Sequence, residues 1–318
     1  MKKERLDIAI AIILNHSKVL VGWRSGQQHQ GNKDEFPGGK VEGLETAEQA
    51  CKREILEEVG IQLSHIAHMQ TIEHEYDDAL LTLHFFYSAL NDEYLNSISL
   101  PWQWVERDAL NTLVFPKAND SILQRLTWPR FIKINHELPK VASDLNQQMH
   151  LAEENNAYLI YWRPSFDATM LTESDIEQLR QTPLKNLIVN LDYFLQLPVE
   201  LQQQINTIHL RQSQLVHLSS SQRRASIFNA KRYIVACHDE ACLAHAQLLG
   251  ADAAFLSPIQ ATQTHPEVIP MGWDQAKQTL KKCHIPVFAL GGLNPSDLTH
   301  AIENGFYGVS GIGKFKDI

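Results

Sequence analysis

The sequence predicts an α/β protein with two domains, residues 1–128 and 129–318. Its length of 318 residues suits about two domains of ordinary size. The first part contains a strand-loop-helix unit marked by a glycine and proline cluster, and the second part alternates short apolar strands with helical stretches. A hydrophobic content of 44% with 20% charged residues is ordinary for a globular protein, so each domain can bury a core.

The chain starts with a predicted β-hairpin. The apolar stretch from Ile8 to Leu14 leads into the turn residues Asn15-His16-Ser17, and a second strand follows from Lys18 to Val21. Basic residues before the first strand imitate a signal peptide, but the apolar stretch is short and Asp7 precedes it. No apolar run in the sequence reaches the roughly 20 residues that a membrane span requires.

A helix is predicted from Ala47 to the residue before Gly60. The breaker cluster Phe36-Pro37-Gly38-Gly39 separates it from the preceding strand. Thr46 is followed by Gln49 at the spacing of a capping box. Gly60 can end the helix, because glycine adopts the left-handed conformation without a Cβ penalty.

Glutamates gather on one side of this helix. At about 100° per residue, Glu54, Glu57 and Glu58 fall within a sector of roughly 100°. Glu45 adds a further carboxylate, and Arg53 is the one cation among them. Hard oxygen ligands at this density suit Mg²⁺ or Mn²⁺, ions that bridge phosphate oxygens, and a solvated acidic face is the alternative interpretation. The apolar side is expected to hold Cys51, Ile55, Leu56 and Val59.

The run from Gly39 to Ile61 resembles the Nudix box, the signature of hydrolases that cleave a nucleoside diphosphate linked to another group. The resemblance implies an N-terminal α/β/α sandwich with a mixed sheet. It also implies that Arg53 orients the cluster through Glu45, and that a helix glutamate or an acid from elsewhere deprotonates the attacking water. The implied catalytic residues are Arg53, Glu54, Glu57 and Glu58, and the implied metal ligands are Gly38, Glu54, Glu57 and Glu58.

Beyond the box, residues 1–127 are similar to the MutT-type pyrophosphohydrolases, which convert 8-oxo-dGTP to its monophosphate and pyrophosphate and so remove oxidised guanine from the nucleotide pool. Asn119 offers the donor and the acceptor that a purine edge requires. Phe36 either packs on the base or belongs to the loop core. The implied substrate-binding residues are Arg24, His29, Glu35, Phe36, Pro37, Gly38, Lys40 and Asn119.

Two positions depart from this resemblance. Ala79 stands where the family often has an arginine, so a nucleotide contact is missing there. Ile98 stands where relatives carry an additional acidic ligand, which leaves the role of the base to a box glutamate or to Asp77 or Asp78. The resemblance therefore predicts pyrophosphohydrolysis and leaves the exact nucleotide open.

Net charge and cysteine content limit the classes of partner and the cellular compartment that are expected. The net charge of −9 argues against a nucleic-acid polymer, because binding its backbone needs a basic face, whereas a free nucleotide with its own metal ion is compatible. The four cysteines form no CxxC pair and no ligand-like group with histidine, which predicts a reduced, cytoplasmic setting. Cys237, next to His238, is expected to be a buried thiol at a strand end and not a nucleophile.

From about Phe131 onward, apolar strands alternate with helical stretches, which is typical of a parallel sheet built from βα units. Eight strands in this part fit a (β/α)₈ TIM-type barrel, whose active site lies at the carboxyl ends of its strands. The expected strands are Phe131–Ile134, Tyr158–Trp162, Asn186–Asn190, Thr207–Leu210, Tyr233–Cys237, Ala253–Leu256, Val287–Leu290 and Gly308–Gly311.

This second part resembles thiamine phosphate synthase and the TenI-type thiazole tautomerase, for example in the segment Ala289-Leu290-Gly291-Gly292-Leu293. The metal ligands of the synthase are not matched, because Leu191 and Gln214 stand where the family has acids, and His265 replaces a lysine. A retained phosphate or thiazole-phosphate site and a structural or regulatory barrel therefore stay open. The candidate phosphate site after the last two strands consists of Gly291, Gly292, Ser310 and Gly311.

The sequence therefore predicts a Mg²⁺- or Mn²⁺-dependent enzyme that hydrolyses a purine nucleoside triphosphate, with 8-oxo-dGTP as the expected substrate. One alternative is a bifunctional protein whose barrel adds a thiamine-pathway reaction. Another is a module that senses a nucleotide without cleaving it. Neither a nucleic-acid polymer nor a membrane is expected as a partner.

Overall fold

The computed structural model describes residues 3–26, 31–77, 79–135, 158–163, 170–182, 184–217, 231–262 and 266–315. His29, Asp78 and His265, which the sequence analysis singles out, lie outside these ranges. The chain divides into two compact units, Met1–Trp128 and Pro129–Ile318. No helix in the described part of the chain is long and apolar enough to cross a membrane.

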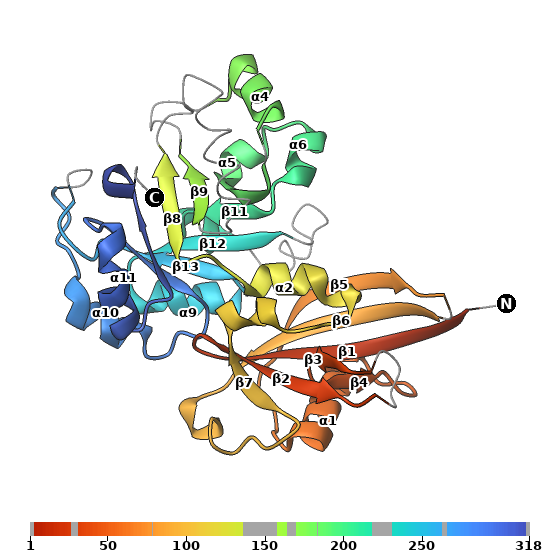
Figure 1. The fold of residues 1–318 in the computed structure, drawn as a ribbon. Coiled ribbons are helices and arrows are strands. Elements are labelled where there is room, and N and C mark those ends of the chain that lie inside the picture. The colour runs from red at the N-terminus through yellow and green to blue at the C-terminus, as the bar shows by residue number, and fades with distance from the viewer. Residues whose placement is uncertain are drawn as a thin grey trace. The chain divides into compact units, whose positions relative to one another are not determined.

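The N-terminal unit is built on a seven-stranded mixed sheet (Figure 1). Strands β1 and β6 run parallel, and the other pairs run antiparallel. The predicted hairpin is present, because β1 and β2 pair at Asn15 and Lys18 across a tight turn. The strands are β1 (Glu4–Asn15), β2 (Lys18–Arg24), β3 (Lys33–Glu35), β4 (Gly38–Lys40), β5 (Ala67–Glu75), β6 (Ala79–Ala89) and β7 (Gln103–Glu106).

Helices cover both faces of this sheet, which confirms the expected α/β/α sandwich. Alternate residues of β1 serve the two layers: Ala9 and Ile13 pack beneath helix α1 (Ala47–Val59), whereas Ile12 packs beneath helix α2 (Asp120–Leu126). Burial on both sides explains why β1 is a nearly continuous apolar run. Short 3₁₀ turns complete the unit, namely η1 (Asp92–Tyr94), η2 (Arg107–Thr112) and η3 (Lys117–Asn119).

The C-terminal unit is a closed barrel of eight parallel strands, as the sequence predicts. Each expected strand is present, with ends that shift by at most one residue. The strands are β8 (Phe131–Asn135), β9 (Tyr158–Trp162), β10 (Leu187–Asn190), β11 (Thr207–Leu210), β12 (Arg232–Cys237), β13 (Ala253–Leu256), β14 (Val287–Leu290) and β15 (Gly308–Gly311). The described helices are α4 (Glu173–Arg180), α5 (Leu191–Phe194), α6 (Val199–Gln204), α7 (Gln212–His217), α9 (Glu240–Leu248), α10 (Gly272–Leu280) and α11 (Leu298–Glu303), with 3₁₀ turns η4 (Leu184–Asn186), η5 (Pro295–Asp297) and η6 (Gly313–Phe315).

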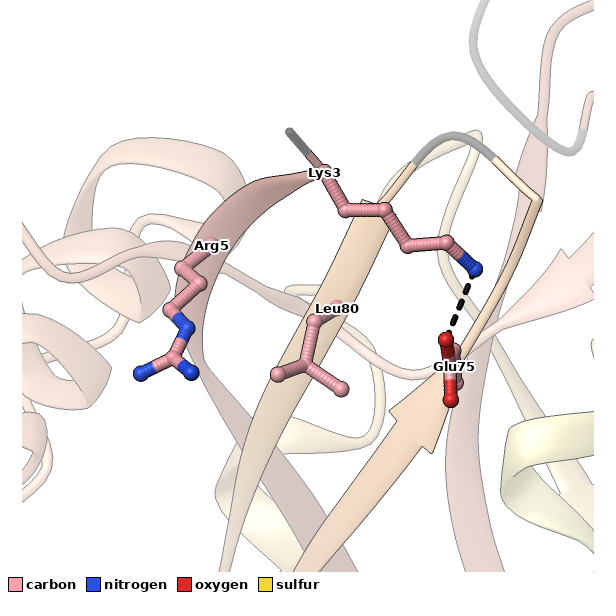
Figure 2. Close-up of a pocket in the computed structure, with 4 residues that line it drawn as sticks. All are labelled: Lys3, Arg5, Glu75 and Leu80. Carbon is pink, nitrogen blue, oxygen red and sulfur yellow. Dashed lines mark hydrogen bonds and ion pairs between the residues drawn. The ribbon is translucent and has the colours of Figure 1, made fainter. Parts of the chain in front are cut away.

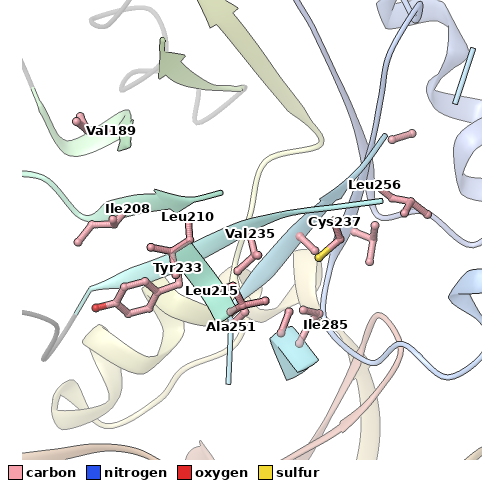
Figure 3. Packing of buried hydrophobic residues seen from close by; sticks show 14 of the residues in the cluster. Val189, Ile208, Leu210, Leu215, Tyr233, Val235, Cys237, Ala251, Leu256 and Ile285 are labelled. Carbon is pink, nitrogen blue, oxygen red and sulfur yellow. The ribbon is translucent and has the colours of Figure 1, made fainter. Parts of the chain in front are cut away.

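Alternation along the barrel strands separates an outer core from an inner one. Ile208 and Leu210 belong to the cluster that packs beneath the surrounding helices, together with Leu215 of α7 (Figure 3). His209, between them, points to the inside and contacts the ring of Phe255 at a centroid distance of 5.8 Å. The inside of the barrel is therefore partly aromatic.

Candidate functional site

Helix α1 forms where the sequence predicts it. It begins at Ala47 behind the capping box, in which the Thr46 hydroxyl accepts from the Gln49 N–H at 3.2 Å and the Thr46 N–H donates to Gln49 Oε1 at 2.8 Å. Gly60 ends the helix with a φ of 76°, and its N–H donates to the Leu56 carbonyl oxygen at 3.1 Å. Local sequence thus sets both ends.

The predicted apolar face of α1 is confirmed except at Leu56. Ala50 and Ile55 are fully buried, but Leu56 is 51% exposed. At about 100° per residue, Glu54 and Glu58 fall inside the sector between Ala50 and Ile55, whereas Leu56 points to roughly the opposite side. The sequence pattern gives the angles between side chains but not which direction faces the sheet. Glu54 and Glu58 therefore share the side of the helix that packs.

Two glycines of β4 lie against these glutamates. A methyl group on Gly39 would lie 2.2 Å from Cδ of Glu54, so Glu54 approaches the strand only because this position lacks a side chain. The Gly38 N–H donates to Oε2 of Glu58 at 3.0 Å. A methyl group on Gly38 would lie 2.2 Å from the Ala9 carbonyl oxygen, so this glycine lets β4 lie close to β1.

Arg53 ties the other carboxylates together. Its guanidinium donates to Glu45 through Nε at 3.2 Å and through Nη2 at 2.7 Å. Nη1 donates to Glu54 at 2.8 Å and to Glu57 at 3.2 Å, and Nη2 also reaches the Lys40 carbonyl oxygen at 3.0 Å. The hydrogen bond from Arg53 holds the pKa of Glu45 below its ordinary value. One cation therefore holds three carboxylates in place.

Glu58 lies on the side of Arg24 and Glu35. Burial, together with the charges of Glu35 and Glu54, raises the pKa of Glu58 to about 7, although the Gly38 N–H and the Arg24 charge oppose the rise. The residue as a whole is exposed, so the burial concerns its carboxyl end, which accepts the N–H of Gly38. This carboxyl group therefore stays partly protonated near neutral pH.

The next wall of the site comes from β2 and β3. Arg24 and Glu35 are joined by a hydrogen bond of 2.6 Å from Nε to Oε2, with side chains 32% and 18% exposed. Tyr76, at the end of β5, links this wall to the loop before α2. Burial raises the pKa of Tyr76, and the nearby Arg24 charge and the Ala118 backbone oppose the rise.

Asn119 lies on that loop. The loop is fastened to β3, because Asp34 and Val114 exchange two hydrogen bonds of 2.8 Å. Asn119 is 6% exposed, and its side-chain amide makes no hydrogen bond to another residue in the described ranges. The amide atoms of Asn119 are not fully enclosed, so water or a ligand can reach them.

Phe36 takes the loop-core position that the sequence left as one of two alternatives. It is 5% exposed, belongs to the core beneath α2, and stacks on Phe115 at a centroid distance of 4.8 Å. Pro37 contributes through its backbone, since its carbonyl oxygen accepts from the Ala11 N–H at 2.8 Å. Both residues shape the site from beneath.

The two residues that depart from the family pattern, Ala79 and Ile98, both lie in apolar surroundings. Ala79 is buried in the core beneath α2, and Ile98 packs against the core beneath α1. Asp77 is exposed in the turn between β5 and β6. The described acids near the β4 glycines are therefore Glu35 and the box glutamates.

The donor set around β4 fits a hard divalent cation. Within the described ranges no three His, Cys, Asp or Glu side chains are already gathered around one point. Glu54 and Glu58 nevertheless lie against adjacent backbone positions, and Glu57 is 59% exposed and held by Arg53. A cation would neutralise the like charges that raise the pKa of Glu58.

A separate hollow of about 440 Å³ in this unit has different chemistry. Lys3 reaches Glu75 at 2.8 Å, and Leu80 pairs with Arg5 on the adjacent strand (Figure 2). An exposed Lys–Glu pair of this kind contributes little to stability. Because it brings together one carboxylate and two cations, this hollow lacks the ligands of the β4 region.

The sequence analysis does not single out Trp102, which holds the last turn of α1. Its Nε1 donates to the Glu58 carbonyl oxygen at 3.1 Å, and a methyl group on Gly22 would lie 2.4 Å from its ring. A glycine inside an apolar strand often marks such a close approach, so Gly22 was the available signal.

The candidate phosphate residues of the barrel separate into two groups. Gly291 lines a cavity at the carboxyl ends of the strands, and Gly292 beside it is exposed. Ser310 is fully buried and its hydroxyl donates to the Ile132 carbonyl oxygen at 2.9 Å. A methyl group on Gly311 would lie 2.3 Å from the Phe315 ring. Ser310 and Gly311 thus serve packing in this structure.

Cys237 is a buried thiol, as expected. It ends β12, is fully buried, and its Sγ lies 3.0 Å from Sγ of Cys242. The hydrogen bond from Cys242 and burial both raise the pKa of Cys237, which disfavours the nucleophilic thiolate.

Family models match both units. A model described as the NUDIX domain matches residues 9–125, and one described as thiamine monophosphate synthase matches residues 179–315. The 8-oxo-dGTP diphosphatase of Escherichia coli (strain K12) is 37% identical over 125 residues, which cover 39% of this chain and 97% of that protein. A structure from a study of MutT of Aliivibrio salmonicida and Vibrio cholerae is 32% identical in sequence. The match covers 39% of this chain and 97% of the chain in that structure, with a TM-score of 0.32.

The barrel has a shorter match. The putative thiamine-phosphate synthase 2 of Aquifex aeolicus is 42% identical over 71 residues, which cover 22% of this chain and 38% of that protein. This chain therefore spans well under half of that relative.

We expect Gly39→Ala to weaken Mn²⁺ binding by roughly 10- to 100-fold, because the added methyl group takes the place of the Glu54 carboxylate. The free energy of unfolding should change by about 1 kcal/mol or less, since the displaced group is the end of a flexible side chain. Calorimetric titration and urea unfolding measure the two quantities. Gly313→Ala, where a methyl group meets nothing within 4 Å, is the control. Unchanged Mn²⁺ affinity in Gly39→Ala would contradict the role of this close approach.

Proposed function

Because this chain belongs to the Nudix hydrolase family, we propose that its N-terminal domain hydrolyses purine nucleoside triphosphates to a monophosphate and pyrophosphate, with 8-oxo-dGTP as the preferred substrate in the cytoplasmic nucleotide pool. The class, a hydrolase of acid anhydrides, follows from the family. The observation that carries the proposal is the convergence of Glu54 and Glu58 on Gly38 and Gly39, with Arg53 holding the neighbouring carboxylates.

Glu54, Glu57 and Glu58, with the Gly38 carbonyl, are the groups that would hold Mg²⁺ or Mn²⁺. When bound, the ion would neutralise triphosphate charge and make an attacking water more acidic. Arg53 keeps the glutamates in position through its hydrogen bonds. Glu58 is our candidate for the base, since its Oε2 accepts the Gly38 N–H and its Oε1 can accept a proton.

The nucleotide would lie between this cluster and the loop before α2. Asn119 has a buried amide whose donor and acceptor could pair with a purine edge. Arg24 would contact the substrate beside Glu35, to which it is hydrogen bonded. The remaining substrate contacts that we propose are His29, Gly38 and Lys40, while Phe36 and Pro37 shape the site from beneath. Attack of water on a phosphorus atom of the triphosphate breaks one P–O–P bond and releases pyrophosphate.

We expect the purified protein to hydrolyse 8-oxo-dGTP with Mg²⁺ or Mn²⁺ in preference to dGTP, ADP-ribose and diadenosine polyphosphates. Glu57→Gln should lower kcat by roughly 10- to 100-fold, because it removes one oxygen ligand. Glu48→Gln on the same helix, which loses only an exposed pair with Lys52 at 2.8 Å, should keep its activity. Product chromatography measures the rates. Binding of 8-oxo-dGTP without cleavage would support a nucleotide-sensing module instead. Faster cleavage of ADP-ribose would show that ADP-ribose, and not 8-oxo-dGTP, is the preferred substrate.

Metal stabilisation should depend on pH through Glu58. Its pKa is about 7 in the folded protein against an ordinary value of 4.5, so the metal-free fold loses stability as the pH rises through this window. A divalent ion must displace the proton, and it then stabilises the ionised form. We expect Mn²⁺ to raise the Tm more at pH 8 than at pH 5.5, as followed by scanning calorimetry, and Glu58→Gln to remove the difference. An equal rise at both pH values would speak against Glu58 as a ligand.

The family match over residues 179–315 favours a thiamine-pathway reaction as a second candidate function for the barrel. The described residues argue against metal-dependent synthesis, because Asn190 is followed by Leu191 and an amide, Gln214, replaces an acid. Expression of the full-length Glu57→Gln variant in a strain that lacks thiamine phosphate synthase tests this candidate. We expect no growth without thiamine; growth would establish a bifunctional protein.

A further inference from the structure

The C-terminal end of α1 is held from outside the helix. The last four carbonyl groups of an α-helix have no partner within it. Here the Gly60 N–H returns to the Leu56 carbonyl oxygen at 3.1 Å, and the Glu58 carbonyl oxygen accepts from Nε1 of Trp102 at 3.1 Å. Trp102 follows Glu58 by 44 residues in the chain. A tertiary hydrogen bond therefore fixes the backbone of Glu58, whose side chain reaches β4.

The indole ring of Trp102 occupies a space that β2 leaves open. Trp102 is 7% exposed and belongs to the core cluster that contains Ile55 of α1. A methyl group on Gly22 would lie 2.4 Å from Cζ3 and 2.5 Å from Cε3 of the ring. Gly22 pairs with Glu35 of β3, and opposite residues of an antiparallel pair share a face of the sheet. The ring therefore packs on the face that carries the Glu35 side chain, and any larger residue at position 22 must displace it.

Glu58 is thus fastened at two points. Its carbonyl oxygen accepts from Trp102, and its Oε2 accepts from the Gly38 N–H at 3.0 Å. The last turn of α1 contains no basic residue that could bond to its carbonyl groups instead. A flexible carboxylate side chain loses conformational freedom when it binds a metal ion, and a backbone that is fixed beforehand lowers this cost. The hydrogen bond from Trp102 therefore favours metal binding without contact with the metal.

We propose that Trp102 is a positioning residue of the N-terminal site, which sets the affinity for a divalent cation by holding the last turn of α1, while Gly22 leaves room for its ring. Trp102 acts through the backbone of Glu58 and contacts neither the substrate nor the ion. The effect on catalysis rests on the proposed function, whereas the affinity for Mn²⁺ is measured without a substrate.

The neighbouring strand β7 provides a matched control. Trp104 packs against the same core cluster as Trp102, but its buried Nε1 has no hydrogen-bond partner in the part of the chain that the structure describes. Replacing either indole with a phenyl ring removes similar apolar surface, and only Trp102→Phe also removes a hydrogen bond to α1. Comparison of the two variants therefore separates the support of α1 from the packing of the core.

Calorimetric titration of the full chain with Mn²⁺ tests the proposal. We expect Trp102→Phe to weaken Mn²⁺ binding by roughly 10-fold or more, as removal of a partner that orients a metal ligand does, and Trp104→Phe to leave it unchanged. Gly22→Ala keeps the indole N–H but displaces the ring, so it should also weaken binding, and it decides the question if Trp102→Phe does not fold. In the metal-free protein, the Gly60 and Gly38 N–H groups should exchange their hydrogens faster in Trp102→Phe than in Trp104→Phe.

Turnover separates positioning from substrate binding. In Trp102→Phe, kcat for 8-oxo-dGTP at limiting Mn²⁺ should fall while KM stays unchanged, because the proposed nucleotide contacts Arg24 and Asn119 are untouched, and excess Mn²⁺ should restore the rate. The proposal is overturned if Trp102→Phe or Gly22→Ala keeps the wild-type Mn²⁺ affinity, if Trp104→Phe weakens it as much as Trp102→Phe does, or if excess Mn²⁺ does not restore the rate. A wild type that binds Mn²⁺ without cleaving 8-oxo-dGTP would contradict the proposed function, and the Mn²⁺ affinities would still decide the role of Trp102.

Discussion

The N-terminal site depends on the close approach between helix α1 and strand β4. Glu54 reaches the backbone of that strand only because Gly39 carries no side chain, and Glu58 accepts the Gly38 N–H. Gathering like charges in this way costs stability unless cations offset them. Arg53 supplies part of the compensation, and the raised pKa of Glu58 marks the part that remains for a metal ion. The capping box at one end of α1 and Trp102 at the other keep the helix at this position.

The two domains differ in the sign of the charged side chains that a phosphate group would meet. Phosphate groups at α1 would meet carboxylates, which can hold them only through a divalent cation. In the barrel, Arg163 and Arg211 dominate the described lining of the cavity, and Asn190 and Gln214 stand where a metal site would need charged oxygens. The described charged residues of the two units therefore have opposite sign at these two places.

Much of the fold follows from local patterns. All eight barrel strands and both ends of α1 lie where the sequence predicts them. Strand alternation and helix caps depend on residues that are close in sequence, so the sequence is enough to predict them. The error concerns direction. Leu56 points outward, although it was expected to pack. Periodicity relates the side chains of one element to each other, and it carries no information about the neighbour that each side faces.

The sequence by itself determined the family, the two-part architecture and the carboxylates of the proposed metal site. The spacing of residues within each segment carries this information. Tertiary structure alone decided that Glu54 and Glu58 lie against β4 and that Phe36 stacks on Phe115. It also brought Arg211, which follows β11, next to Asp192 in α5. These contacts join residues far apart in the chain, and only the closure of the sheet and the barrel fixes which of them meet.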